Sequence, residues 1–526
     1  MNNSIRRLPT GIQSFAKLRE EHFVYVDKTE YIYYVAQAAA PFFLSRPRRF
    51  GKSLFLSALR AFWEGKKELF EGLAIERLTA DDPEAWKKHP VLYIDFNFGN
   101  YHQENTLEEV LDAHLREWEN EYGISAASGS LGVRFSEVIK QAHKKTGLRC
   151  VVLVDEYDKP LLDLIDMPER QKHCKDTIKG FFGTLKSRDE DIQNIFITGV
   201  SKFHKVSIFS DLNQLNDISL SEKFSGICGI TESEIKAYFA PELADIAKKN
   251  NITEEECIIK LKRQYDGYRF HQNGSHVYNP YSLLKAFYDK EFGRYWFETG
   301  TPTFLIKQLK QIAFDLRKLT DHTIYANESL LKDYSTENPD PIPLLYQTGY
   351  LTIVDYDAES CEYTLSLPNN EVKYGFLQNL MPVYIEDCGS SSGLDIYTFR
   401  RYIVRGDIDN IMKVLTALFA RITYTRENDP FENYFQAVIY LVFTLLGQFT
   451  ECEMHTFSGR IDCRVQTKEF IYLFEFKRDE SAEKALQQIN DKGYTLPFAA
   501  DSRKLYKIGV SFDSEKRMLS EWKVEE

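Results

Sequence analysis

The sequence lacks the features that would mark it as secreted, zinc-binding or membrane-spanning. Its eight cysteines are scattered, with no C-x-x-C pair and no cysteine–histidine cluster at the spacing of a zinc site. The longest strongly apolar run, Val438 to Leu446, is far shorter than the ~20 residues that a membrane-spanning helix needs. The N-terminal segment has no apolar core of the kind that a signal peptide requires. We therefore expect a cytoplasmic protein with reduced cysteines and no membrane partner.

Internal repeats and low-complexity tracts are also missing, and basic residues do not dominate. The chain has 526 residues and a net charge of −12, which argues against a uniformly basic surface. The charge is uneven, however, because residues 1–60 hold ten lysines and arginines against four acidic residues. With 43% apolar and 14% aromatic residues, the chain can build sizeable cores, in roughly two to four domains.

The first part of the chain alternates strand-like and helix-like segments. Short apolar runs predict strands at four places, which are Phe42–Ser45, Val91–Phe96, Cys150–Val154 and Asn194–Thr198. Amphipathic stretches between them predict helices, which are Lys52–Trp63, Leu107–Tyr122 and Phe135–Lys145. This alternation is typical of an α/β fold with a largely parallel sheet.

The rest of the chain has a different pattern. From about residue 220 to 384 it becomes mainly helical and irregular, and the glycine–serine stretch 389–393 has the composition of a linker. Two helical patterns and three strand-like runs follow, before a final helix near 481–491. We expect a second, smaller α/β domain at the C-terminus, with domain bounds at about 1–220, 221–388 and 395–526.

The loop after the first predicted strand ends in Gly51-Lys52-Ser53, the second half of a Walker A motif. In such loops the backbone N–H groups and the helix N-terminus hold phosphates, the lysine reaches the β and γ phosphates, and the serine hydroxyl ligates Mg²⁺. Arg46 stands where the motif has its first glycine, so this loop must close by other means, for example through Pro47. The predicted nucleotide contacts form one continuous segment, which is Arg46, Pro47, Arg48, Arg49, Phe50, Gly51, Lys52, Ser53 and Leu54.

Two later strands end in polar residues that would complete an ATP site. The strand at 150–154 is followed by Asp155, which would hold Mg²⁺, and by Glu156, which would orient or deprotonate the attacking water. The strand at 194–198 ends in Thr198, and Ser201 follows closely, where a sensor of the γ-phosphate would lie. Because these features occur in the right order, we favour an ATP site over a buried sheet with ordinary polar ends.

Two further segments each have two interpretations. Residues 25–29 either contact the adenine or ribose, or they start a helix with Asp27 or Thr29 as its N-cap. The middle region is rich in aromatic side chains, which we expect to pack a helical domain rather than to stack on nucleobases. They are Tyr268, Phe270, Tyr278, Tyr281, Tyr295, Trp296 and Phe297.

A second group of chemically competent residues lies near the C-terminus. Glu475 and Lys477 share one face of a predicted strand, and Asp462 lies on what would be the neighbouring strand of a hairpin. Two carboxylates and a lysine suit metal-assisted phosphodiester hydrolysis, since the acids hold Mg²⁺ and the lysine orients the attacking water. A solvated surface ion pair is the alternative. Further candidates are a third metal ligand and two contacts to the phosphate backbone, namely Glu432, Gln488 and Tyr494.

Together these motifs resemble a bacterial family of AAA-ATPase-like proteins fused to a nuclease domain of the PD-(D/E)xK superfamily. The resemblance covers nearly the whole chain and rests on short strings, which are LPTGIQSF at 8–15, YVDKT at 25–29, RPRRFGKS at 46–53, DEYDKP at 155–160, TGVSK at 198–202, DGYRF at 266–270, YNPY at 278–281, GRID at 459–462 and EFK at 475–477. It implies a P-loop ATPase of the additional-strand, catalytic-glutamate type, a helical lid region and a restriction-endonuclease-like domain. Arg46 then belongs to the family's own version of the loop.

We therefore expect an enzyme that binds and hydrolyses ATP and cleaves nucleic acid with the help of Mg²⁺, with DNA favoured over RNA as its partner. The expected catalytic residues are Glu156, Asp462, Glu475 and Lys477. The expected metal ligands are Ser53, Asp155, Glu432, Asp462 and Glu475. One alternative is a nucleotide-dependent switch whose C-terminal domain binds nucleic acid or a partner without cleaving. Another is a degenerate ATPase that serves as a scaffold, and the sequence leaves the oligomeric state open.

Overall fold

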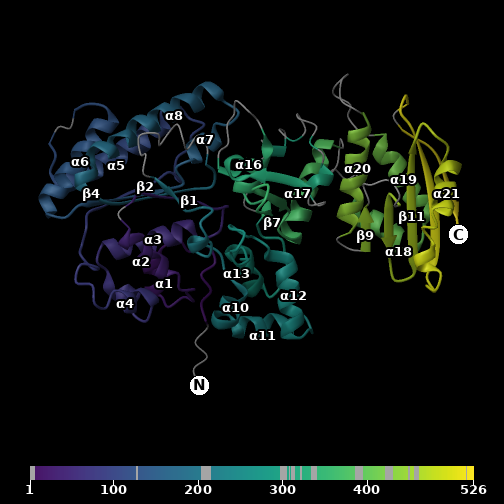
Figure 1. Ribbon diagram of the computed structural model, residues 1–526, viewed down its shortest axis with the longest axis horizontal. Helices are drawn as coiled ribbons and strands as arrows, with labels where there is room; N and C mark the ends of the chain where they lie inside the picture. The colour runs from purple at the N-terminus through teal and green to yellow at the C-terminus, as the bar shows by residue number, and fades with distance from the viewer. Residues whose placement is uncertain are drawn as a thin grey trace. The chain divides into compact units, whose positions relative to one another are not determined.

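The computed structural model describes most of the chain and divides it into two compact units. Unit 1 comprises Met1–Thr299 and Ile324–Glu371, and unit 2 comprises Gly300–Thr323 and Val372–Glu526. The described residues are 6–38, 40–125, 128–202, 215–296, 305, 306, 309, 314, 316–319, 323–332, 340–384, 395–420, 431–447, 451–454, 461–516 and 518–526. Each unit is organised around a five-stranded sheet (Figure 1).

The sheet of unit 1 has the strand order β2-β3-β4-β1-β5, and all its neighbouring strands are parallel. Its strands are β1 (Phe42–Ser45), β2 (Val91–Asp95), β3 (Cys150–Asp155), β4 (Ile192–Gly199) and β5 (Asn216–Asp217). β1 and β3 are buried along their whole length, as parallel strands covered on both faces must be. β4 lies between β1 and β3, so an additional strand separates the strand before the phosphate loop from the strand that ends in Asp155.

Helices cover both faces of this sheet (Figure 1). On one face α3 (Lys52–Trp63) packs against β2 and β3, and on the other α5 (Thr106–Tyr122) packs against β2 and α6 (Leu131–Thr146) against β3. The other helices of this region are α1 (Phe15–Glu20), α2 (Thr29–Gln37), α4 (Ala74–Leu78), α7 (Lys159–Asp163) and α8 (Pro168–Phe182).

The remainder of unit 1, which we call the accessory region (residues 215–296 and 324–371), combines helices with a small antiparallel sheet. Four helices, α10 (Glu232–Tyr238), α11 (Ala240–Lys249), α12 (Glu254–Tyr265) and α13 (Pro280–Asp289), surround a common apolar cluster. Capping boxes at Thr231 and Thr253 fix the starts of α10 and α12. The small sheet has the order β6-β8-β7, and its chain segment contains β6 (Ile324–Asn327), α15 (Glu328–Lys332), α16 (Pro341–Gln347), β7 (Thr352–Asp357) and β8 (Glu362–Ser366).

Unit 2 contains a mixed sheet with the order β13-β12-β11-β10-β9, in which only β11 and β12 are parallel neighbours. Its strands are β9 (Glu451–Met454), β10 (Cys463–Gln466), β11 (Phe470–Arg478), β12 (Lys504–Asp513) and β13 (Met518–Glu525). Its helices are α18 (Ile396–Arg405), α19 (Ile408–Phe419), α20 (Phe431–Leu446) and α21 (Ala482–Asp491), preceded by α17 (Asn370–Tyr384), whose first two residues belong to unit 1.

Side-chain alternation along β11 divides the core of unit 2 into two layers. Ile471 and Leu473 point to one face, where they pack with Leu486 of α21. Phe474 and Phe476 contact the ring of Phe443 on α20, which covers the opposite face. The face toward α21 is the one that also carries Glu475 and Lys477, because these residues alternate with the phenylalanines.

The expected fold class is confirmed, with a parallel sheet first, a largely helical middle and a C-terminal mixed α/β sheet. Sequence analysis did not anticipate the small sheet β6-β8-β7, nor α18, β12 and β13. The strands β6, β7 and β8 are short and partly exposed, so their apolar signal is weak. The proposed linker 389–393 lies outside the described residues, and the division into three domains stays a prediction.

The apolar run Val438–Leu446 forms the buried part of α20, so its apolar character serves the core of unit 2. Of the helices that the structure describes, none combines the length and the apolar character that a bilayer crossing requires.

Candidate functional site

The segment between β1 and α3 forms a tight turn whose end is the start of a helix. Gly51 is the N-cap residue of α3 and has a φ of 96°, in the left-handed region that glycine adopts without strain. Arg49 also has a positive φ, of 69°. The first N–H groups of α3 therefore follow the turn directly, as an anion-binding helix N-terminus requires.

Lys52 is enclosed by this turn. Its side chain is only 3% exposed, and its Nζ donates hydrogen bonds to the carbonyl oxygens of Arg46 (3.0 Å) and Pro47 (3.3 Å). The same ammonium lies 3.2 Å from Oε1 of Glu156. Glu156 has a φ of 53°, an unfavourable value for a residue other than glycine. The structure thus brings together the two residues expected to bind phosphate and to activate water.

Asp155 is the centre of a buried polar group beside Lys52. One of its oxygens accepts a hydrogen bond from Oγ1 of Thr198 at 2.7 Å, and the Ser53 side chain is near enough to lower the pKa of this carboxyl. Burial raises the pKa of Asp155, and the negative charge of Glu156 raises it further. Ser53, Asp155 and Thr198 therefore meet at one point, although three different segments supply them.

Asp158 completes the acidic group. It accepts hydrogen bonds from the backbone N–H of Val200 (3.1 Å) and from both the backbone N–H (2.6 Å) and the hydroxyl (2.7 Å) of Ser201. Burial, together with the charge of Glu156, raises the pKa of Asp158. Ser201, expected as a phosphate sensor, thus has its hydroxyl bound to Asp158, which ties the end of β4 to the turn after β3.

Arg46 has a different environment from the one that sequence analysis expected for it. Its side chain is 1% exposed, and it donates hydrogen bonds to the carbonyl oxygens of Ser45 (2.9 Å), Ser219 (2.7 Å) and Phe224 (3.2 Å). The guanidinium also lies 4.0 Å from the ring centre of Phe270. Arg46 therefore fastens the start of the loop to the accessory region, and it is not among the residues that line the cavity described below.

Aromatic residues of the accessory region hold the rest of the loop. Phe50 is buried and meets the ring of Tyr268 edge-on at 4.7 Å, and Arg49 lies 4.9 Å from the ring of Tyr281. The indole N–H of Trp296 donates a hydrogen bond to the carbonyl oxygen of Arg48 at 3.3 Å. The aromatic residues of the middle region that the structure describes thus pack, as expected, and part of what they pack against is the loop before α3, whereas Phe297 lies outside the described residues.

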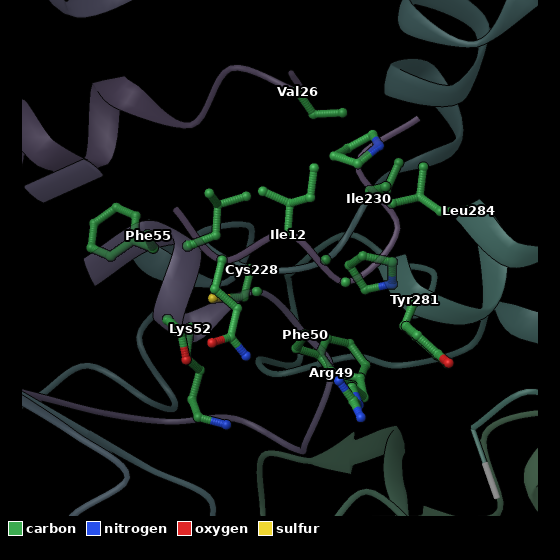
Figure 2. Close-up of a pocket in the computed structure, with 18 of the residues that line it drawn as sticks. Ile12, Val26, Arg49, Phe50, Lys52, Phe55, Cys228, Ile230, Tyr281 and Leu284 are labelled. Atoms are coloured by element: carbon green, nitrogen blue, oxygen red, sulfur yellow. The ribbon is translucent and has the colours of Figure 1, made fainter. Parts of the chain in front are cut away.

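A cavity of about 490 Å³ lies over the loop (Figure 2). Its polar lining comes from the start of α3 and from Arg48, Arg49, Asn97, Glu156 and Lys159. Figure 2 shows the apolar side chains of Ile12, Val26, Ile230 and Leu284 together at the other end of the cavity. A space with one cationic end and one apolar end is suited to a phosphate ester that carries a flat apolar group.

The segment 25–29 lines the cavity and leads into α2, whose N-cap is Lys28 rather than the expected Asp27 or Thr29, and its contact with adenine or ribose stays a prediction. Tyr25, Val26 and Lys28 line the cavity. Asp27 accepts hydrogen bonds from the backbone N–H (2.9 Å) and the hydroxyl (2.7 Å) of Thr29, the first residue of α2. Asn97 and Cys228 also line the cavity, although sequence reasoning did not single them out. Asn97 could have been recognised, because it follows β2 at the edge of the sheet where β1 and β3 also end.

The second candidate site lies on the face of β11 that α21 covers. Asp462 immediately precedes β10, and its Oδ2 accepts a hydrogen bond from the backbone N–H of Phe476 at 2.9 Å. The backbone N–H of Asp462 lies 3.4 Å from Oε2 of Glu475, and Nζ of Lys477 lies 3.3 Å from Oε1 of Glu475. Gln488 of α21 also donates to Oε1 of Glu475. The hairpin and α21 thus assemble four of the six residues that the sequence indicated.

Two carboxyl groups lie buried at this second site, and each affects the pKa of its neighbours. The side chain of Glu475 is 2% exposed, and burial together with the charge of Asp462 raises its pKa to about 7. Burial raises the pKa of Asp462 as well. Tyr494 follows α21. Burial raises the pKa of its hydroxyl, and the negative charges of Glu475 and Asp462 raise it further. Among the described residues, Lys477 is the cation that lies beside these two buried carboxyl groups.

Both sites have the ligand chemistry of a hard divalent cation. Asp155 and the Ser53 hydroxyl offer oxygen ligands in unit 1, and Asp462 and Glu475 offer carboxylates in unit 2, which suits Mg²⁺ better than a soft metal. Glu432 lies in α20, but its side chain is outside the described part of the structure. Within the described residues, no group of three or more His, Cys, Asp and Glu side chains converges as a metal site.

Comparison with known proteins finds two family regions in the chain. The family model described as "Predicted AAA-ATPase" matches residues 9–209, and the model described as "PD-(D/E)XK nuclease superfamily" matches residues 430–522. A protein of Azotobacter chroococcum mcd 1, described as "Uncharacterized protein in vnfD 5'region", is 37% identical to this chain over 535 residues. The alignment covers 99% of this chain and 99% of that protein. The resemblance expected from the sequence motifs is therefore confirmed, with the ATPase-like region at 9–209 and the nuclease-superfamily region at 430–522.

Replacing Glu475 by glutamine is expected to change the stability of unit 2 in a pH-dependent way. Because folding raises the pKa of Glu475 from 4.5 to about 7, its ionisation opposes folding, and the wild type loses stability as pH rises between these values. At about 1.4 kcal/mol per pKa unit, the loss reaches about 3 kcal/mol by pH 8, and Glu475→Gln avoids it. The measurement is the opening free energy of the β11 amides from hydrogen exchange at pH 5 and pH 8, with metal chelated.

The control for this experiment is Glu469→Gln, in the exposed turn between β10 and β11, where the same chemical change should leave the pH dependence as in the wild type. A difference between Glu475→Gln and the wild type that is equal at both pH values would contradict the argument.

Proposed function

Because the chain belongs to the family of AAA-ATPase-like proteins with a C-terminal PD-(D/E)XK nuclease domain, we propose that ATP bound at the phosphate loop controls a metal-dependent nuclease site in unit 2. The observation that carries this proposal is that Lys52, Ser53 and Glu156 line the polar end of the 490 Å³ cavity, with the buried carboxyl of Asp155 directly beside them.

At the first site the N–H groups around Gly51 and the ammonium of Lys52 bind the phosphates. In doing so Lys52 exchanges its contacts with two loop carbonyls and with Glu156 for contacts with phosphate oxygens. Glu156 is then free to orient the attacking water and accept its proton. Ser53 and Asp155 would hold Mg²⁺, which offsets the negative charge of the phosphates. The apolar end of the cavity takes the adenine.

At the second site Asp462 and Glu475 would hold the metal ion, which lowers the pKa of bound water and polarises the scissile phosphate. Lys477 lies beside Glu475, where it can orient the water and offset developing charge. Gln488 fixes one oxygen of Glu475, and Tyr494 lies next to the carboxylates, so both are placed to contact the phosphate backbone of a nucleic acid. We favour DNA over RNA as the substrate.

A second candidate function is a nucleotide-dependent switch whose unit 2 binds nucleic acid without cutting it. One observation favours it: Asp462 and Glu475 already accept hydrogen bonds from the backbone N–H of Phe476, from Lys477 and from Gln488, which occupies oxygens that a metal ion would need. Cleavage assays distinguish the two functions directly.

Lys52→Ala is expected to abolish the stabilisation of unit 1 by ATP. A ligand that binds only the folded state at about 100 times its Kd stabilises the protein by about 2.7 kcal/mol, which a thermal melt with and without Mg-ATP detects. The matched control is Lys67→Ala, at an exposed lysine of the same region, which should keep the shift. If Mg-ATP does not raise the Tm of the wild type, the scaffold alternative is favoured instead.

Lys477→Ala is expected to reduce nucleic-acid cleavage on the order of 100-fold or more, since it removes the group that positions the attacking water. The assay uses linear, circular and single-stranded DNA and RNA with Mg²⁺ or Mn²⁺. Lys468→Ala, in the exposed turn before β11, is the control and should cleave like the wild type. Intact substrates under every condition, together with measurable binding, would support the switch.

Coupling between the sites is tested in the same assay. If ATP controls cleavage, Lys52→Ala makes the cleavage rate independent of ATP concentration, whereas the wild type responds to it. A variant that responds to ATP as the wild type does would refute the coupling and leave the nuclease assignment intact.

A further inference from the structure

The phosphate loop is held from outside by a tryptophan whose backbone is itself held by a buried glutamate. The indole Nε1 of Trp296 donates to the carbonyl oxygen of Arg48 at 3.3 Å, and the ring packs edge-on against Tyr350 at 5.2 Å. Trp296 is 7% exposed, so this hydrogen bond is shielded from water. Trp296 is neither one of the residues proposed above to contact phosphate nor a member of the acidic group around Asp155.

The hydrogen bond to Arg48 has a direct consequence for phosphate binding. Since a peptide unit is planar and trans, its C=O and its N–H point in opposite directions. Fixing the carbonyl of Arg48 therefore fixes the direction of the N–H of Arg49, the next residue, which has the unusual φ of 69°. Both arginines line the cavity. Trp296 thus determines how one N–H of the phosphate loop is aimed.

Glu371 fixes Trp296 in turn. Its Oε1 accepts hydrogen bonds from the backbone N–H groups of Tyr295 (2.6 Å) and Trp296 (2.9 Å), and the residue is 1% exposed. Glu371 is the second residue of α17. Its carboxylate is therefore near the N-terminus of that helix, where the helix dipole favours a negative charge.

A second set of contacts joins the phosphate loop to the residues that precede α17. Phe50 of the loop packs on Tyr268, and the preceding Gly267 has a φ of 97°. A Cβ atom on Gly267 would lie 2.1 Å from the carbonyl oxygen of Pro368, so the two backbones are in close contact. Nδ2 of Asn369 donates to the carbonyl oxygen of Asp266 at 2.7 Å. The residues just before α17 are thus tied to the loop independently of Trp296.

Glu371, the residue that holds Trp296, is also the last residue of unit 1. The boundary between the two units falls inside α17, between Glu371 and Val372. A change at the first turn of α17 therefore acts on a helix that continues into the unit with the second site.

We propose that Trp296 and Glu371 are positioning residues that transmit nucleotide occupancy of the phosphate loop to α17. The inference rests on the proposed function in one respect, namely that the loop binds ATP. When phosphate draws the N–H of Arg49 into its own hydrogen bond, the Arg48 carbonyl turns with it, and the indole of Trp296 and the carboxylate of Glu371 follow. Conversely, the link prepares the loop for phosphate before ATP arrives.

The test is hydrogen exchange of the full-length chain with and without Mg-ATP, read at peptides from α3 and from the 372–384 part of α17. In the wild type, ATP is expected to slow exchange in both peptides. Trp296→Phe keeps an aromatic ring but removes the indole N–H, so slowing at α3 should persist while slowing at α17 falls at least threefold. The Kd for ATP should rise about threefold to tenfold, as the loss of one shielded hydrogen bond implies.

Two further sets of variants separate this link from a general loss of structure. Trp86→Phe removes an indole N–H that donates to Oγ1 of Thr79 in the same unit, and it should leave both responses unchanged. Glu371→Gln keeps one acceptor oxygen for the two N–H groups, whereas Glu371→Ala keeps none. We expect the α17 response to be largely retained in the glutamine variant and lost in the alanine variant.

The outcomes are distinct. If ATP slows exchange at α3 in the wild type but not at α17, or if Trp296→Phe responds like the wild type at α17, the proposed link is overturned and ATP binding stands. If ATP changes neither peptide in the wild type, the proposed ATP site itself fails, and the link fails with it.

Discussion

The parallel register of β1, β4 and β3 is the constraint on which the first site depends. Leu44 is paired with Thr198, and Val154 with Ile197, so these strands end together at one edge of the sheet. Whatever follows each strand must therefore lie at that edge, as is general for open parallel sheets. The phosphate loop follows β1, and the acidic turn follows β3. A one-residue slip of β4 would turn Thr198 away from Asp155 and break the 2.7 Å hydrogen bond between them.

At both sites, carboxyl groups of the described residues lie buried close together. In unit 1, Lys52 pairs with Glu156 at 3.2 Å, and burial together with the charge of Glu156 raises the pKa of both Asp155 and Asp158. In unit 2, Lys477 faces the carboxyl groups of Asp462 and Glu475. Buried charges that lack full compensation cost stability. The divalent cation that we propose for each site would offset this cost.

The sequence could predict those features that depend on residues close together along the chain, and not those that depend on contacts between distant segments. Short motifs inside a strand–loop–helix unit, such as Gly51-Lys52-Ser53, are local, so the bounds of β1 and α3 and the place of the loop followed from the pattern alone. Glu475 and Lys477 were likewise placed on one face of a strand by its period of two. The roles of Arg46 and Ser201 were not predictable, because they depend on Ser219, Phe224, Phe270 and Asp158, which no local pattern connects to them.

Arg46 shows how a phosphate loop can dispense with the first glycine of its motif. Glycine at that position lets a chain make a turn that other residues resist. Here the backbone is held instead by long-range contacts: the guanidinium binds three carbonyl oxygens, Phe50 inserts between Tyr268 and Phe270, and Trp296 binds the Arg48 carbonyl. Most of these partners belong to the accessory region. That region therefore helps to shape the loop that we propose to bind phosphate, and a fragment ending near residue 220 would carry the motif without most of these contacts.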